Sequence, residues 1–284
     1  MYVVCYSGGH SSALCGIEAV RKYGKENVVL LNHDISPRVE DADIKRFKGE
    51  VAEYLGLPIT YANHARWDAA TPIDVCLEAG VWQTGKGNIL CTNRLKTAPF
   101  KRWLKEHDPE KKNTYIYGFD ASPRERARAQ KRSQIMGLDG YKTAFPLINW
   151  ERTILSTKEI GIEPPMGYNR FKHANCTGCL KAGWQHWYIV YCERPDIWVA
   201  AREAEEELGH SLHKDRNGII FLEDKEEMFE NMKKAGVIPT EHITPTKFWF
   251  DAKAKVKEMN LNTLAEQMEE SAEHDEGVCL DCIA

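Results

Sequence analysis

The sequence lacks several features that define large classes of protein. No apolar run approaches the roughly 20 residues that a membrane-spanning helix needs, so we expect no membrane partner. A net charge of −4 over 284 residues gives no global basic field for nucleic acid. Internal repeats and low-complexity stretches are also missing. These absences favour a globular protein with one large domain, or one domain with a smaller appendage.

The cysteine content argues against an extracellular disulfide scaffold. Nine cysteines are an odd number, and the first predicted strand begins directly after Met1, which leaves no space for a signal peptide. We therefore expect a cytoplasmic protein with reduced thiols. Four cysteines have apolar neighbours and are interpreted as core residues. These are Cys5, Cys15, Cys76 and Cys192.

Alternating strands and helices predict a doubly wound, mostly parallel α/β sheet. The expected strands are 2–7, 27–31, 58–63 and 114–118. The expected helices are 11–23, 39–55, 93–105, 123–136, 157–161, 195–208, 225–234 and 246–270. Residues 145–150 are expected to be extended, and 67–90 to be irregular. We divide the chain into an α/β nucleotide-binding domain (1–165), a Cys-x-x-Cys region (166–194) and a helical C-terminal region with a mobile tail (195–284).

A glycine-containing turn follows the first predicted strand and opens the first helix. Serine hydroxyls and side-chain-free glycines let an anion approach the backbone, and the helix N-terminus attracts negative charge. The turn therefore predicts a phosphate site, although a turn that binds nothing remains the structural alternative. It is not a Walker loop, because no Gly-Lys-Ser/Thr follows. The candidate residues are Ser7, Gly8, Gly9, His10, Ser11 and Ser12.

Polar residues also follow the second predicted strand. In a doubly wound sheet the ligand lies at the carboxyl ends of the strands. Asn32 and Asp34 are therefore candidates for contacts with ribose or adenine, and Asp34 for a catalytic role. Capping of the next segment is the alternative reading.

Three further segments have the residue types of metal or anion sites. Cys91 opens a basic helix containing Lys96, which favours a thiolate; a buried cysteine before a solvated helix is the alternative. Cys176-x-x-Cys179 brings two sulfurs to one centre, as zinc or iron–sulfur sites require. With zinc, His173 or His186 could complete the site. One face of a predicted helix carries Arg124, Arg128 and Arg132. Arginines so arranged can bind phosphate or sulfate, and the alternative is a charged helix face that only contacts water.

These motifs together resemble a known enzyme group. Residues 7–12 resemble the PP-loop (Ser-Gly-Gly-x-Asp-Ser) of ATP pyrophosphatases and of the phosphoadenylylsulfate (PAPS) reductase family, with Ser11 in place of Asp. Cys91, then Lys-x-x-Pro-Phe from Lys96, then Cys-x-x-Cys, is similar to iron–sulfur sulfonucleotide reductases. Those proteins have a Cys-Cys pair where this chain has Cys91-Thr92. The resemblance covers residues 1–190.

The resemblance implies an adenine nucleotide alpha hydrolase-like fold that binds ATP or a sulfonucleotide (PAPS or APS) with Mg²⁺. It implies a [4Fe–4S] cluster on Cys91, Cys176 and Cys179, with zinc as the alternative. Lys96, Arg124 and Arg128 would neutralise the bound anion. By position only, the tail cysteines Cys279 and Cys282 resemble a catalytic thiol.

Three functions follow as expectations from this resemblance. The first is ATP-dependent, adenylating and pyrophosphate-releasing sulfur transfer, with tRNA or DNA as a sulfur acceptor. The second is thiol-dependent sulfonucleotide reduction, with a thiol reductant protein as partner. The third is a nucleic-acid-modifying or phage-defence component related to DNA phosphorothioation. A structural zinc protein is a further option, and the pattern leaves a homo-oligomer open.

Overall fold

A five-stranded, all-parallel sheet in the order β3-β2-β1-β4-β5 forms the centre of the N-terminal part. The computed structural model describes residues 1–259 except 86–87, 175 and 217. The strands are β1 (Tyr2–Cys5), β2 (Val28–Asn32), β3 (Ile59–Tyr61), β4 (Thr114–Ile116) and β5 (Lys142–Ala144). The central strand β1 is apolar throughout because helices cover both faces of the sheet. The predicted parallel α/β architecture is confirmed.

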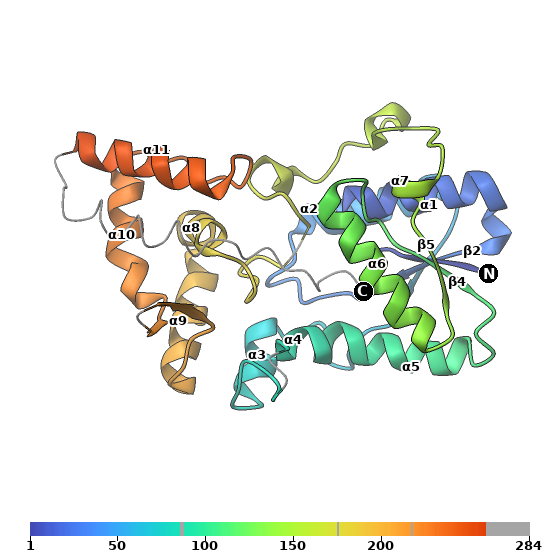
Figure 1. Cartoon of the computed structure of the whole chain (residues 1–284), viewed down its shortest axis with the longest axis horizontal. Helices are drawn as coiled ribbons and strands as arrows, with labels where there is room; N and C mark the ends of the chain where they lie inside the picture. Colours follow the sequence, from blue (N-terminus) through green and yellow to red (C-terminus); the bar gives the residue numbers. More distant parts are fainter. Residues whose placement is uncertain (86–87, 175, 217, 260–284) are drawn as a thin grey trace. The chain divides into compact units, whose positions relative to one another are not determined.

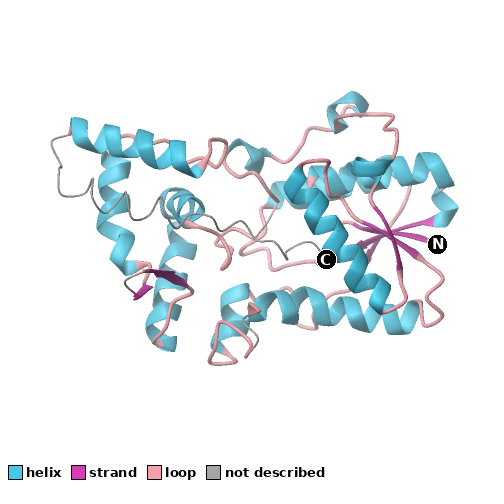
Figure 2. Ribbon diagram, in the orientation of Figure 1, coloured by secondary structure: helices cyan, strands magenta, loops and turns pink. Residues whose placement is uncertain are grey.

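The helices divide between the two faces of the sheet (Figures 1 and 2). On one face, α1 (His10–Tyr23), α2 (Ala42–Leu55) and α7 (Pro146–Asn149) pack into one apolar cluster. On the other, α5 (Ala98–His107) and α6 (Pro123–Leu138) pack into a second cluster. The apolar faces that the sequence predicts for α1 and α2 are therefore buried against the sheet.

Two local expectations are wrong. Residues 145–150 are not extended, because α7 begins at Pro146, where a missing N–H costs nothing. The Ile148 and Asn149 N–H groups then donate to the Phe145 carbonyl, both at 3.0 Å. Within the region expected to be irregular, α3 (Pro72–Leu77) begins with a capping box between Thr71 and Asp74.

The chain forms two compact units. The first contains Met1–Ala69 and Asn93–Tyr168, and therefore the whole parallel sheet. The second contains Ala70–Thr92 and the described residues from Asn169 to Met259. The early segment 70–92, which carries Cys91, thus folds with residues that lie about 100 positions later in the chain. The predicted division into three consecutive segments (1–165, 166–194 and 195–284) therefore does not match the two units.

The second unit is built mainly from helices around buried aromatic side chains. Its elements are α3, α4 (Leu90–Thr92), α8 (Trp184–Glu193), α9 (Pro195–Leu208), β6 (His213–Asp215), β7 (Gly218–Ile220), α10 (Glu223–Lys234) and α11 (Pro245–Glu258). β6 and β7 form an antiparallel hairpin. α9 has the predicted bounds, whereas α8 was not predicted. No helix among the described residues is long and apolar enough to span a bilayer.

Short helical turns complete the first unit. These are the 3-10 turns η1 (Lys25–Asn27), η3 (Thr157–Ile160) and η4 (Met166–Asn169), the last of which runs one residue past the unit boundary, and the π-helical turn η2 (Asn93–Thr97). η2 connects α4, with Cys91, to α5 and carries Lys96. Turns of π geometry often occur at functional sites, and this one contains Lys96, which the sequence analysis predicts to contact a bound anion.

Candidate functional site

The strand order defines a switch point between β1 and β4. From β1 the sheet continues to β2 and β3 on one side, and to β4 and β5 on the other. The loops that leave the carboxyl ends of β1 and β4 therefore diverge, and ligands of open α/β sheets bind in the crevice between such loops. Residues 6–9 connect β1 to α1, and residues 117–122 connect β4 to α6.

Gly118, in the loop after β4, is in close contact with the backbone of the first turn of α1. A Cβ atom on Gly118 would lie 2.8 Å from the Ser12 backbone nitrogen and 2.9 Å from the Ser11 carbonyl carbon. Real Cβ atoms essentially never come that close to backbone atoms. Only glycine fits here without moving the first turn of α1. No local pattern ranks Gly118 above the other glycines, since the contact joins segments over 100 residues apart.

Gly8 is required for two reasons. Its φ of +85° lies in the left-handed region. A Cβ at this position would also lie 2.7 Å from Cδ and 2.8 Å from Cγ of Lys48. The following residue, Gly9, precedes α1 and supplies no side-chain cap to the helix. A glycine turn therefore leads directly into α1, and residue 9 has no side chain that could cap the N-terminus of the helix.

The polar side chains of the loop are partly used within the fold. The Ser7 hydroxyl donates to Ser12 Oγ (3.3 Å), and the Ser12 hydroxyl donates to the Gly9 carbonyl (2.8 Å). The His10 N–H donates to the Tyr168 hydroxyl (2.9 Å), and His10 Nε2 accepts from the Thr157 N–H (3.2 Å). Burial, followed by the charge of Arg152, lowers the pKa of His10. His10 therefore holds the segment around η3 against α1 as a neutral side chain.

Asn32 lies at the carboxyl end of β2 beside the same loop. Its Nδ2 donates to the Tyr6 carbonyl at 2.5 Å. The side chain is almost completely buried, yet its Oδ1 has no hydrogen-bond partner among the described residues. A buried acceptor without a donor is costly. A ligand amine or hydroxyl group at this strand end would satisfy it.

Asp34 belongs to a buried group of ion pairs. Its Oδ1 accepts from Lys45 Nζ (2.9 Å) and Lys48 Nζ (3.1 Å). Glu40 Oε2 pairs with the same two lysines at 3.2 and 3.0 Å. Burial opposes ionisation of Asp34, but the two lysines outweigh it and lower its pKa. This geometry gives Asp34 a structural role, and its catalytic role stays a prediction.

Lys48 is a residue that the sequence-based prediction missed, although a signal existed. It lies on the apolar face of α2 between Ile44 and Val51, and only 2% of its side chain is exposed. A lysine on such a face is buried only when it is paired. Its aliphatic part supports Gly8, and its ammonium group binds the two acids.

The basic residues predicted to bind an anion have different surroundings. Burial, with the charge of Lys96, lowers the pKa of His33, the residue that follows β2, to about 4. Arg124 is exposed at the start of α6. Arg128 stacks over the Phe119 ring at 5.2 Å and pairs with Glu125 at 2.5 Å. Arg128 therefore already interacts with other side chains of the fold.

The three predicted cluster cysteines fall in the same compact unit. Cys91 and Cys176 are partly exposed, and Cys179 is buried. The Cys179 N–H donates to His186 Nε2 (3.4 Å), and His186 Nδ1 is 3.1 Å from Glu241 Oε1. Thiols beside a carboxylate-oriented imidazole are donors that suit zinc or iron.

An assembled metal centre is not seen, however. Among the described residues, no three His, Cys, Asp or Glu side chains are arranged to hold an ion. The predicted residues Cys279 and Cys282 lie outside the described part of the chain. The cluster assignment therefore rests on donor type and on the shared unit.

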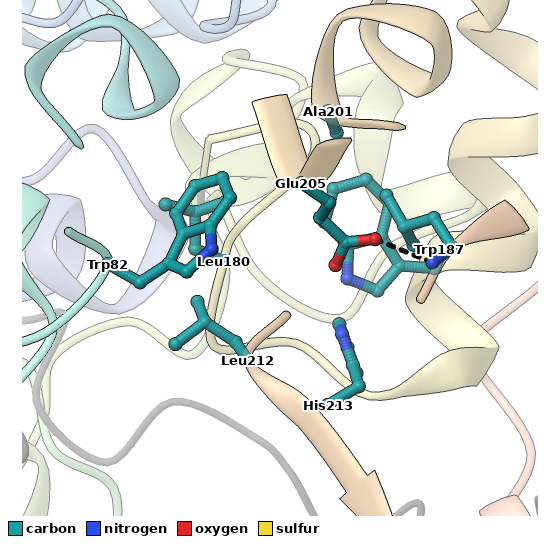
Figure 3. A pocket seen from close by; sticks show the side chains of 8 residues that line it. Trp82, Leu180, Trp187, Ala201, Glu205, Leu212 and His213 are labelled. Atoms are coloured by element: carbon teal, nitrogen blue, oxygen red, sulfur yellow. Dashed lines mark hydrogen bonds between the residues drawn. The ribbon is translucent and has the colours of Figure 1, made fainter. Parts of the chain in front are cut away.

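The second unit also contains a small cavity of about 10 Å³, close to the space that one water molecule needs. Figure 3 shows Glu205, Trp187 and His213 on one side of it, with Trp82, Leu180 and Leu212 on the other. Glu205 accepts from the Ser211 hydroxyl (2.5 Å) and the Leu222 N–H (2.6 Å). Burial raises the pKa of Glu205 to about 7.

Trp82 attaches segment 70–92 to the later part of the second unit. Its Nε1 donates to the His210 carbonyl at 2.6 Å, and α3 packs against α9. This attachment explains how Cys91 comes to share a unit with Cys176 and Cys179.

Comparison with known proteins adds no relative, because no family model, no curated protein and no solved structure matches the chain. The class that the fold itself defines is a parallel α/β protein with a β1/β4 switch point. Its glycine-lined loop and the buried acceptor of Asn32 both lie at the carboxyl ends of the central strands.

Proposed function

We propose that the chain is a sulfur-handling enzyme that binds an adenine nucleotide, with ATP preferred, at the loop Ser7–Ser12. One observation carries the nucleotide part: Gly118 contacts the first turn of α1 at the switch point so closely that only glycine fits. Such an approach leaves the helix N-terminus and a glycine turn at the position where α/β folds bind phosphates. The sulfur part rests on the cysteine motifs.

Each side of the crevice has a distinct role in this proposal. The Ser11 and Ser12 N–H groups in the first turn of α1 bind phosphate oxygens. Lys96 and Arg124 offset the charge of the phosphates. The Oδ1 atom of Asn32 accepts from the adenine amine or a ribose hydroxyl, which satisfies the buried acceptor. In the reaction, an acceptor oxygen bonds to the α-phosphorus and pyrophosphate leaves. A sulfur nucleophile then displaces AMP from the activated acceptor.

The cysteines would hold the metal group that the motifs imply. Cys91, Cys176 and Cys179 offer three thiolates. His186, whose two ring nitrogens contact Glu241 and the Cys179 N–H, would position Cys179. A [4Fe–4S] cluster on the three cysteines would supply iron that can carry sulfur, whereas zinc would be structural. Anaerobic purification followed by iron, sulfide and zinc analysis separates the two. Colourless protein with stoichiometric zinc excludes the cluster.

The nucleotide proposal is tested by equilibrium binding of Mg·ATP and of PAPS to the full chain. Gly9→Trp fills the loop and should abolish binding of both nucleotides. Gly49→Trp is the matched control, because Gly49 lies exposed on α2 with open space around its Cβ position. Unchanged binding in Gly9→Trp defeats the loop assignment. Binding of PAPS but not ATP would instead favour the sulfonucleotide reductase.

A further inference from the structure

The two helices on the second face of the sheet have an unusual share of the positive charge. Together α5 and α6 contain eight lysines and arginines but only two glutamates, a net charge of +6. The whole chain has a net charge of −4, so the remaining residues carry −10. The eight basic residues are Lys101, Arg102, Lys105, Arg124, Arg126, Arg128, Lys131 and Arg132.

These charges face solvent on one side of the sheet. α5 and α6 bury apolar side chains, among them Trp103 and Met136, in the same core cluster. Their polar sides therefore point away from the same face of the sheet. Six of the eight basic side chains are exposed, and Arg128 and Arg132 are half-buried. Among the described residues, Lys105 and Lys131 form no ion pair that would neutralise them. We call these eight residues the basic surface.

We propose that the basic surface binds the phosphate backbone of a double-stranded nucleic acid. Five of its eight residues are arginines, whose planar guanidinium groups suit phosphate oxygens. The acidic remainder of the chain repels a polyanion and so directs it to this face.

A duplex fits better than a single strand. Single strands are held largely by bases that stack on exposed aromatic rings. α6 has no Phe, Trp or Tyr, and the aromatic residues of α5, Phe100 and Trp103, are only 4% and 7% exposed. The basic surface therefore carries positive charge, but α5 and α6 expose no Phe, Trp or Tyr ring on which a base could stack. The inference stands on charge and exposure alone; combined with the proposed function, it names nucleic acid as the sulfur acceptor.

The test measures binding of the full chain to a fluorescently labelled 20-base-pair DNA duplex by anisotropy, between 50 and 200 mM salt. Lys105→Glu/Lys131→Glu should weaken binding at every salt concentration. It should also reduce the slope of log K against log salt by about two, about one for each phosphate that the variant no longer neutralises. Lys25→Glu/Lys158→Glu makes the same charge change at exposed lysines of η1 and η3, which pack with α1. This control should leave the affinity within about twofold.

Several results would overturn the proposal. One is no duplex binding at 50 mM salt, and another is equal weakening by both double variants, which would reflect net charge alone. Tighter binding of a single-stranded oligonucleotide would exclude the duplex. Binding of phosphatidylserine vesicles through Lys105 and Lys131, without duplex binding, would assign the surface to a membrane. Gly9→Trp should bind the duplex normally, so failure of the nucleotide proposal is detected separately.

Discussion

Replacing Gly118 by alanine should disturb the first turn of α1 from across the sheet. The new Cβ would be 2.8 Å from the Ser12 nitrogen, against 3.4–4 Å for an ordinary contact. One of the two backbones must therefore move by about 0.6 Å or more. Overpacking of this kind costs about 1–3 kcal/mol. In a protein of this size each kcal/mol lowers the melting temperature by about 2–4 °C.

The same displacement should weaken the nucleotide site, because the first-turn N–H groups would lose their alignment. We expect the affinity for Mg·ATP to fall at least about tenfold, since misplacement of about 1 Å can cost about a hundredfold. Thermal unfolding and equilibrium binding measure the two effects on one sample. A melting temperature and an affinity both equal to those of the unmodified protein would refute the close contact.

Gly137→Ala is the control for this variant. Gly137 lies in α6 with nothing within 4 Å of its Cβ position. Alanine is better than glycine inside a helix by about 0.5–1 kcal/mol, so the melting temperature should rise slightly. Nucleotide affinity should not change. The contrast separates the steric contact at Gly118 from the general effect of removing a glycine.

Three further predictions concern stability. The pKa of Glu205 is raised to about 7 from an ordinary 4.5, so stability falls as the pH rises between these values, by up to about 3 kcal/mol. In Glu205→Gln, the free energy of unfolding in urea should therefore differ less between pH 5 and pH 8 than in the unmodified protein. Lys48→Met leaves Asp34 and Glu40 with the partly exposed Lys45 as their one ion-pair partner among the described residues. It should cost about 3 kcal/mol in urea unfolding at pH 7, and a cost below 0.5 kcal/mol would contradict the pairing. Ser122→Ala removes the cap of α6, which binds the Glu125 N–H, and should cost about 1 kcal/mol by thermal unfolding.

Four of the five strands of the parallel sheet could be predicted because their determinants are local, whereas β5 (Lys142–Ala144) was not predicted. Continuous apolar strands and amphipathic helices alternate along the first 140 residues, and Pro195 and Gly209 mark both ends of α9. α8 could not be predicted in the same way. It is apolar on nearly all sides, and even Gln185 and His186 are buried, so it has little helical periodicity to detect.

The loop of the candidate site could be predicted from the sequence, but the residues that pack against the loop could not. Ser7–Ser12 is a contiguous motif, whereas the contacts of Gly118 with α1 and of Lys48 with Gly8 join distant segments. Such contacts depend on packing between elements, which a single sequence does not encode locally. The partnership of segment 70–92 with the residues after Asn169 was hidden for the same reason.

That partnership has a consequence for how the chain folds during its synthesis. Segment 70–92 leaves the ribosome before the residues that cover it, and α9, against which α3 packs, ends only at Leu208. At about 5–20 residues per second, the interval is about 6–23 s. Ile73 and Trp82, both buried in the finished structure, lack their final partners throughout that interval. Between the emergence of segment 70–92 and that of α9, the nascent chain thus exposes apolar side chains that the finished fold buries.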